Sequence, residues 1–212
     1  MKILFQGDSV TDAGRDRSNP HDMGEGYPRY ASAMIQDSYP NASFEFVNLG
    51  ISGNRTGDLV NRLESDFIDV QPDIVSIMIG INDVWHHYEF YNIETTDEQF
   101  EANLRTILTA IRERTHARIL LIQPILWYGG CGDEMRAELA RKQAIFKRMA
   151  ETFADAYLPI HDILAEQHFE DPTVYSADGV HPTSDGAMLI GEAYLRAVSP
   201  LIEACAAEAE RD

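Results

Sequence analysis

The sequence predicts a three-layer α/β fold, in which helices cover both faces of a parallel β-sheet. Short apolar runs of strand length, rich in Ile, Val and Phe, alternate along the chain with longer patterns of helical period. Such alternation is typical of parallel strands joined by right-handed crossovers. No internal repeat, low-complexity tract or linker interrupts the pattern. We therefore expect residues 1–212 to form one domain, since a chain of this length fits a single core.

Five apolar runs are expected to form the strands of the sheet. Each run is bounded by turn residues, and the last one is the weakest of the five. The predicted strands are Lys2–Gln6, Phe44–Asn48, Asp73–Ile79, Arg118–Gln123 and Tyr157–Ile160.

The clearest helical pattern lies between the third and fourth predicted strands. Thr96 and Gln99 precede it with the spacing of a capping box, and its apolar residues fall on one stripe. That stripe consists of Phe100, Leu104, Ile107, Leu108 and Ile111. Further helices are predicted at Tyr27–Ser38, Gly57–Val70, Asp133–Ala156 and Thr183–Ala207, with a fraying Ala/Glu-rich end after Pro200.

The charge of the chain excludes the common polyanionic partners. Seventeen Lys and Arg face 35 Asp and Glu, which gives a formal net charge of −18. A surface of this sign repels phosphate backbones and anionic lipid headgroups, so we expect neither nucleic acid nor a membrane as a partner. Cys131 and Cys205 are the only cysteines, too few for a disulfide framework, and we expect free thiols in a reducing compartment.

No segment of the sequence resembles a membrane span or a secretory leader. The longest apolar stretch, Ile74 to Ile81, contains Ser76 and is far shorter than the ~20 residues that a spanning helix needs. The first residues after Met1 reach a turn at Gly7 without a hydrophobic segment of signal-peptide length. These features predict a cytoplasmic protein.

Polar residues follow several of the predicted strands at the edge where such sheets bind ligands. Ligands bind beyond the carboxyl ends of parallel strands, so the residues just after each strand are the first candidates for chemistry. Downstream, a loop with Asp178 and His181 precedes the last predicted helix. The candidate segments are Gly7-Asp8-Ser9-Val10, Asn48-Leu49-Gly50, Gly80-Ile81-Asn82-Asp83 and Asp178-Gly179-Val180-His181-Pro182.

Ser9, His181 and Asp178 are the residues that could supply a nucleophile and its base. Ser9 lies at a strand-to-helix turn, where a hydroxyl can be exposed as a nucleophile, although a serine there also fits a simple helix cap. Gly179 allows the chain to fold back so that Asp178 can orient the imidazole of His181, although a lone loop histidine is commonly a surface residue. Their joint occurrence favours a Ser-His-Asp arrangement.

Asn82 and Gly50 are candidate donors to an oxyanion. An amide directly after a buried strand needs a partner, either a loop carbonyl or a bound oxyanion. Gly50 is either a plain turn glycine or a backbone N–H donor to the same oxygen. We expect no metal and no cofactor, because the pairs His21-Asp22 and His161-Asp162 lack further ligands nearby in the sequence.

These four segments resemble the blocks of the SGNH, or GDSL-type, serine hydrolases over almost the whole chain. The resemblance implies a flavodoxin-like α/β/α fold with a five-stranded sheet, a triad of Ser9, Asp178 and His181, and an oxyanion hole formed by Ser9, Gly50 and Asn82. Two departures are mild, since Val10 follows the serine where leucine or isoleucine is common, and Ile81 precedes the asparagine where threonine is common.

Within the family, the runs Gly50–Asn54 and Ser76–Trp85 are similar to the bacterial acetylxylan esterase branch. That similarity implies deacetylation of xylan-derived sugars inside the cell, often by a homo-oligomer. Arg55 and Trp85 lie just beyond Gly50 and Asn82 in the sequence, so they are candidates to contact a sugar ring. Core tryptophan and surface arginine are the alternatives for these two. A lysophospholipase or thioesterase is the alternative function. A non-catalytic carbohydrate-binding protein fits less well, because it needs no triad.

Overall fold

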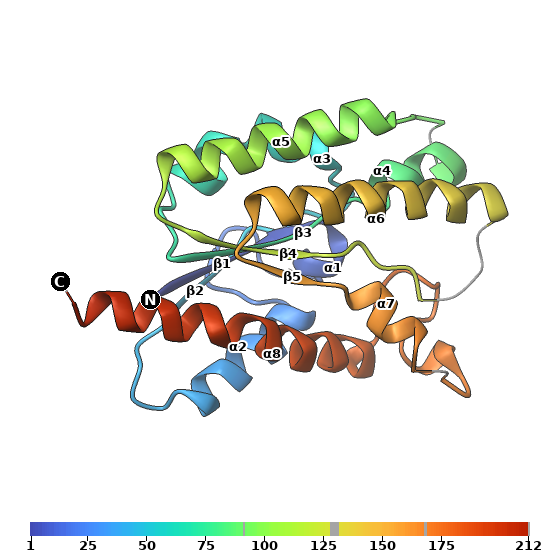
Figure 1. Ribbon diagram of the computed structural model, residues 1–212. Helices are drawn as coiled ribbons and strands as arrows, with labels where there is room; N and C mark the ends of the chain where they lie inside the picture. The colour runs from blue at the N-terminus through green and yellow to red at the C-terminus, as the bar shows by residue number, and fades with distance from the viewer. Residues whose placement is uncertain (91, 128–131, 168, 212) are drawn as a thin grey trace.

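A five-stranded parallel sheet with helices on both faces forms the core of the computed structural model (Figure 1). The strand order is β2-β1-β3-β4-β5. This order confirms the predicted α/β/α class and its flavodoxin-like arrangement. The strands are β1 (Lys2–Gly7), β2 (Glu45–Asn48), β3 (Ile74–Met78), β4 (Arg118–Ile122) and β5 (Ala156–Leu158).

The structure describes residues 1–90, 92–127, 132–167 and 169–211. Cys131 lies outside these residues, and Cys205 is a free, partly buried thiol. The helices are α1 (Ser9–Asp12), α2 (Tyr27–Ser38), α3 (Thr56–Asn61), α4 (Ile81–Trp85), α5 (Asp97–Arg114), α6 (Asp133–Phe153), α7 (Ile160–Ala165) and α8 (Ser184–Ala209). Two π-helical segments, η1 (Glu64–Ile68) and η2 (His86–Phe90), and the 3₁₀ turn η3 (Pro172–Val174) complete them.

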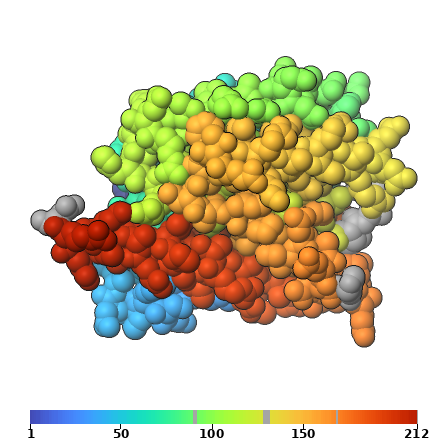
Figure 2. Space-filling view, in the orientation of Figure 1, coloured from blue at the N-terminus to red at the C-terminus, as the bar shows by residue number. Residues whose placement is uncertain are grey.

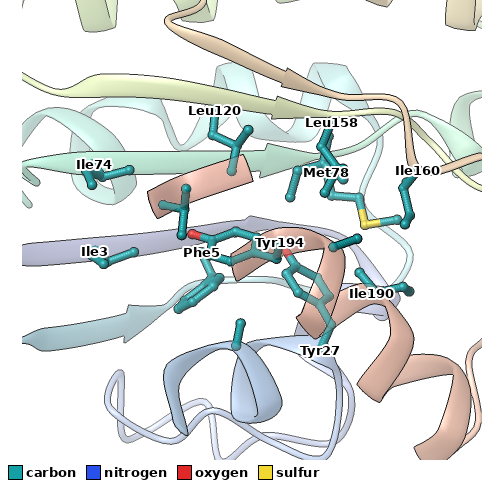
Figure 3. Packing of buried hydrophobic residues seen from close by; sticks show 14 of the residues in the cluster. Ile3, Phe5, Tyr27, Ile74, Met78, Leu120, Leu158, Ile160, Ile190 and Tyr194 are labelled. Atoms are coloured by element: carbon teal, nitrogen blue, oxygen red, sulfur yellow. The ribbon is translucent and has the colours of Figure 1, made fainter. Parts of the chain in front are cut away.

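Two hydrophobic cores hold the helical layers against the sheet. On one face, α3, α5 and α6 cover strand residues such as Val75 and Leu121. On the other, α2, α7 and α8 bury a cluster in which Phe5 lies against Tyr27 and Tyr194 (Figure 3), with ring centroids 6.0 and 5.1 Å from that of Phe5. Both faces of the sheet are therefore dry, which explains why the strands read as nearly continuous apolar runs.

The outer surface formed by α8 and α6 is continuous in the space-filling view, with α2 below α8 (Figure 2). Within the described part of the chain, no helix is both long and apolar enough to cross a membrane. The helix α8 continues through Pro200 to Ala209, so the expected fraying after the proline is not seen. Its partly buried face packs onto the sheet, which compensates for the one backbone donor that a proline lacks.

Local sequence signals predict some helices closely and others less well. The capping box of Thr96 and Gln99 is confirmed, because Gln99 N donates to Thr96 Oγ1 at 3.2 Å and Thr96 N to Gln99 Oε1 at 3.1 Å. The single helix expected at Gly57–Val70 is wrong. It is divided into α3 and the π-helical η1, where Arg62 turns back to donate to Leu49 O at 2.8 Å. Packing against a neighbouring loop thus overrides the helical period of the sequence.

The topology gathers the loops after β1 and β3 at one crevice. From β1 the chain moves to β2 on one side and then to β3 on the other, so these loops diverge at the switch point of the sheet. The helices α1, α4 and α7 all begin at this carboxyl edge (Figure 1). Ser9 and Asn82 are thereby brought to one edge, as predicted.

Two fully buried carboxyl groups lie at this edge, directly after β1 and within α4. Asp8 caps α1 by accepting a hydrogen bond from Val10 N at 3.0 Å, and burial raises its pKa to about 7. Asp83 accepts hydrogen bonds from Thr56 N at 3.0 Å and Thr56 Oγ1 at 2.7 Å, and burial raises its pKa to about 6. The fold therefore favours the neutral form of both groups.

We predict that Asp8→Asn becomes more stable relative to the wild type as the pH rises from 5 to 8. A raised folded-state pKa contributes stability below the unfolded-state value, and that stability is lost as pH rises through about 7. Asparagine keeps the cap but does not ionise. The difference in Tm should grow by about 4 °C or more, at roughly 2–4 °C per kcal/mol for a domain of this size.

The measurement is calorimetric Tm against pH for both proteins. His86 and His161, whose pKa values burial lowers, titrate in the same window with the opposite effect, but they cancel in the comparison. Asp37→Asn removes an exposed carboxylate and is the control. A Tm difference for Asp8→Asn that stays flat with pH, like that of the control, would contradict the assignment.

Candidate active site

Ser9 is the first residue of α1 and not its cap. Asp8 takes the capping position, which leaves the hydroxyl of Ser9 free to point away from the helix. Ser9 Oγ lies 2.8 Å from His181 Nε2, a hydrogen bond between residues 172 positions apart. The strand-to-helix turn thus presents a partly buried hydroxyl to an imidazole, the pairing that activates a serine nucleophile.

The loop before α8 holds His181 through contacts of its own. His181 Nδ1 lies 2.6 Å from Asp178 Oδ2, while Asp178 Oδ1 accepts hydrogen bonds from the backbone N–H groups of Val180 and His181 at 2.9 and 2.7 Å. Gly179 has φ +85°, a conformation that favours glycine, and it reverses the chain as the sequence predicts. One carboxylate therefore fixes both the backbone and the ring of His181.

Ser176 also holds this loop in place, and the sequence did not indicate that role. It is fully buried, and its Oγ donates to His181 O at 2.8 Å. Partial burial acts to raise the pKa of the Asp178 carboxyl, but the hydrogen bonds from His181 and the backbone outweigh it and lower that pKa below its usual value. Asp178 is consequently ionised at neutral pH and can stabilise a protonated imidazole.

Asn82 is buried at the start of α4, with one amide hydrogen already used. Its side-chain Nδ2 donates to Asn54 O at 3.0 Å. The loop-carbonyl alternative is therefore present in the structure, and it also orients the amide. A primary amide carries two hydrogens, so one donor of Asn82 is left for a further acceptor.

The predicted oxyanion donor at Gly50 is contradicted by its hydrogen bond. Gly50 N donates to Asn48 Oδ1 at 3.0 Å, so it has no N–H left for a substrate. A Cβ at Gly50 would lie 2.7 Å from Asp12 N, which shows that the glycine is required for close approach of two backbones. Gly50 is thus a glycine required for close packing, which agrees with the alternative of a plain turn glycine.

Gly53, three residues further on, has the properties expected of a donor. It is exposed, has φ +83°, and a Cβ there would meet no atom within 4 Å. Its N–H has no hydrogen-bond partner among the described residues, whereas the next residue, Asn54, holds the Asn82 side chain. The sequence contains both glycines in one short turn, and only the hydrogen-bond pattern separates the packing glycine from the open one.

The turn at residues 51–54 is fixed against the chain on both sides of Ser9. Ile51 N donates to Gly7 O at 3.1 Å, while Ser52 N and Ser52 Oγ donate to Asp12 Oδ2 at 2.8 and 2.7 Å. Arg15 Nε in turn donates to Gly50 O at 3.0 Å. These contacts hold the turn beside the hydroxyl of Ser9 without using the N–H of Gly53.

Trp85 and Arg55, the two expected sugar-binding residues, occupy different surroundings. The Trp85 ring lies against that of His181, with centroids 5.4 Å apart, and packs on a cluster that contains Val180. Arg55 is half-buried and lines a separate cavity of about 250 Å³ that also contains Glu94. The structure therefore places the Trp85 ring against His181, whereas Arg55 lines a cavity beside the turn that holds Asn82.

A cavity of about 310 Å³ opens beside Ser9 and His181. Small and apolar residues form much of its wall, together with the polar residues Glu25 and Ser184. In the ranges that the structure describes, no three His, Cys, Asp or Glu side chains gather as metal ligands. Among the described residues, the lining of the cavity is formed by Ser9, Val10, Ala13, Gly14, Glu25, Gly26, His181, Pro182 and Ser184.

Comparisons with known proteins agree with this geometry. The chain is 35% identical to an acetylxylan esterase of Geobacillus stearothermophilus over 208 residues, covering 93% of both proteins. A crystal structure of that esterase matches with a TM-score of 0.85 and 34% identity over 92% of both chains. Mutants of it described as catalytic replace a serine, an aspartate, or a histidine three positions after that aspartate, each by alanine.

Two further matches extend the likeness. An α/β hydrolase from the metagenome of Lake Arreo, Spain, has a TM-score of 0.85 at 28% identity, covering 94% of this chain and 95% of that one. The model of the GDSL-like lipase/acylhydrolase family matches residues 5–189, a range that contains Ser9, Gly53, Asn82, Asp178 and His181. The chain belongs to the GDSL-like lipase/acylhydrolase family.

Proposed function

We propose that the protein hydrolyses short-chain carboxylic esters, principally acetyl esters, through an acyl-enzyme on Ser9. The observation that carries the proposal is the hydrogen-bonded chain from Ser9 Oγ to His181 Nε2 at 2.8 Å and from His181 Nδ1 to Asp178 Oδ2 at 2.6 Å. This is the geometry in which an imidazole removes the proton of a serine hydroxyl while a carboxylate holds its tautomer.

The reaction follows from the position of each group. His181 accepts the proton of Ser9 as Oγ attacks the ester carbonyl, and it then donates that proton to the leaving alcohol oxygen. Water then attacks the acyl carbon while His181 takes its proton, and His181 returns that proton to Ser9 Oγ as the bond between Oγ and the acyl carbon breaks and the acid leaves. Asp178 stays ionised throughout and stabilises the imidazolium that forms at each step.

Three donors are proposed to hold the oxyanion: the backbone N–H groups of Ser9 and Gly53 and the free amide hydrogen of Asn82. Ser9 N lies in the first turn of α1, where helices leave backbone donors unpaired. Gly53 replaces Gly50 in this role, because the N–H of Gly50 is occupied. Donors fixed in this way stabilise developing charge without reorganisation.

Acetylated xylan-derived sugars are the proposed substrates. The support is the likeness to the acetylxylan esterase of Geobacillus stearothermophilus over nearly the full length of both chains. A lysophospholipase or thioesterase remains the second candidate, since the same catalytic groups serve a longer acyl chain. A single domain and a cytoplasmic location are further parts of the proposal and come from the sequence, and a homo-oligomer is a part that comes from the resemblance to acetylxylan esterases.

The first test is acetate release from acetylated xylo-oligosaccharides, run beside 4-nitrophenyl acetate and octanoate, with Ser9→Ala as the blank. We expect activity on both acetates, loss of it in Ser9→Ala, and little activity on octanoate. His181→Ala should match Ser9→Ala, and the double variant should be little worse, because the residues act as a unit. A preference for octanoate would instead support the lipid or thioester alternative.

Asn82→Ala should lower kcat by roughly a hundredfold or more, the usual cost of removing one oxyanion donor. Steady-state kinetics on 4-nitrophenyl acetate measure this directly. Because Asn82 also donates to Asn54 O, the circular dichroism and Tm of the variant must be checked against the wild type. A folded variant with less than a fivefold loss in kcat would remove Asn82 from the oxyanion hole.

Trp85→Leu should lower kcat by a similar factor on sugar and aryl acetates. The reason is its contact with the His181 ring, which every ester substrate requires. We expect about a fivefold to tenfold loss, on the order of one packing contact of an aromatic pair. Parallel measurement of kcat and KM on both substrate classes decides the point, since a rise in KM confined to the sugar ester would show that Trp85 binds substrate.

A further inference from the structure

We infer that Glu25 is a specificity residue that receives the leaving alcohol, accepting hydrogen bonds from its hydroxyl groups and disfavouring esters of anionic alcohols. The inference rests on the proposed esterase function. The leaving alcohol then occupies the side of the site bounded by His181, and Glu25 selects among alcohols there.

The cavity beside Ser9 lies on the alcohol side of the reacting carbon. Ser9 and His181 form part of its wall, whereas Asn82 and Gly53, the proposed oxyanion donors, do not. In the tetrahedral intermediate the oxyanion points to its donors, and the leaving oxygen must lie within reach of His181 Nε2. The group attached to that oxygen therefore extends into the space bounded by His181.

Of the described residues that line this cavity, Glu25 alone carries a carboxylate. Its side chain is exposed and has no hydrogen bond or ion pair with any other described residue, so its oxygens are available to a ligand. Its backbone is fixed, because Glu25 N donates to Ala13 O at 2.9 Å and the preceding Gly24 N donates to Asp22 Oδ1 at 3.0 Å. The backbone that carries this unpaired carboxylate is thus fixed at the wall of the cavity.

The rest of the wall fits a polar, compact alcohol. The lining residues include Gly14, Gly26 and Ala13, and a Cβ at Gly26 would lie 2.6 Å from that of Ala13, so larger side chains would close the space. None of the lining residues is aromatic apart from the imidazole of His181. A carboxylate accepts charge-assisted hydrogen bonds from neutral hydroxyl groups and repels a negative charge. A polyhydroxylated, uncharged alcohol such as a sugar satisfies both conditions.

The test compares Glu25→Gln with the wild type on three acetate esters that share the acyl group. The esters are acetylated xylobiose, neutral 4-nitrophenyl acetate and anionic 4-acetoxybenzoate, each measured as kcat/KM at low ionic strength. Asp185→Asn is the matched control, because Asp185 is exposed and adjacent to Ser184 but does not line the cavity. Equal Tm values establish that all variants are folded.

In Glu25→Gln, the ratio of acetylated xylobiose to 4-nitrophenyl acetate should fall about tenfold, as expected for hydrogen bonds to a charged group. The ratio of 4-acetoxybenzoate to 4-nitrophenyl acetate should rise roughly threefold or more, and the rise should shrink in added salt. Asp185→Asn should leave both ratios within about twofold, since an exposed charge outside the cavity is screened.

The inference is overturned if both ratios are unchanged in Glu25→Gln, or if Asp185→Asn moves them equally. A wild-type protein that cleaves the aryl acetates but not acetylated xylobiose would contradict the sugar-ester proposal alone, and the two aryl esters would then decide the role of Glu25. A wild type that cleaves none of the three would overturn the esterase proposal and the role of Glu25 together.

Discussion

The buried carboxylate of Asp12 is the contact on which the arrangement of the site depends. It lies at the end of α1, one turn beyond Ser9, and it binds the backbone and hydroxyl of Ser52 as well as Arg17. The hydrogen bonds from Arg17 and Ser52 outweigh the burial that opposes them and lower the pKa of Asp12. An ionised group therefore joins the helix of the nucleophile to the turn of Gly53, and neither can move without the other.

Buried carboxyl groups also hold other segments in place along the carboxyl edge of the sheet. Asp8 caps the helix after β1, and Asp83 in α4 holds the start of α3 through both polar atoms of Thr56. Each carboxyl group lies near the end of one strand and fixes a segment from the same or the neighbouring crossover. Because buried donors are costly to leave unpaired, these contacts define one geometry for loops that the hydrophobic cores do not reach. Asp8 and Asp83 differ from Asp12 in having raised pKa values, because burial outweighs the hydrogen bonds that they accept, whereas the hydrogen bonds from Arg17 and Ser52 outweigh burial at Asp12.

The sequence predicts the fold well because its signals are local and periodic. The apolar runs, the capping box of Thr96 and the fold-back at Gly179 each depend on residues a few positions apart. The segments bearing Ser9 and Asn82 follow from the rule that sites lie beyond the strand ends, whereas the loop of His181 is identified by the spacing of its aspartate and histidine. The error at Gly50 has a different origin. Gly50 and Gly53 are both glycines and lie three residues apart in the same turn. Only the hydrogen bond from Gly50 N to Asn48, which forms in the folded chain, distinguishes the packing glycine from the proposed donor.

The two halves of the proposed triad differ in exposure, and this difference suits the two halves of the reaction. Ser9 is partly buried on a capped turn, whereas His181 and Asp178 lie on an exposed loop, with 42% and 47% of their side-chain surfaces accessible. A fixed nucleophile keeps its distance to the oxyanion donors, which is the quantity that electrostatic stabilisation requires. An accessible imidazole lets the alcohol leave and water enter on the same side. Deacylation needs that water at His181 Nε2, so the exposed side of the loop serves the second half of the reaction. The partly buried position of Ser9 serves the first half.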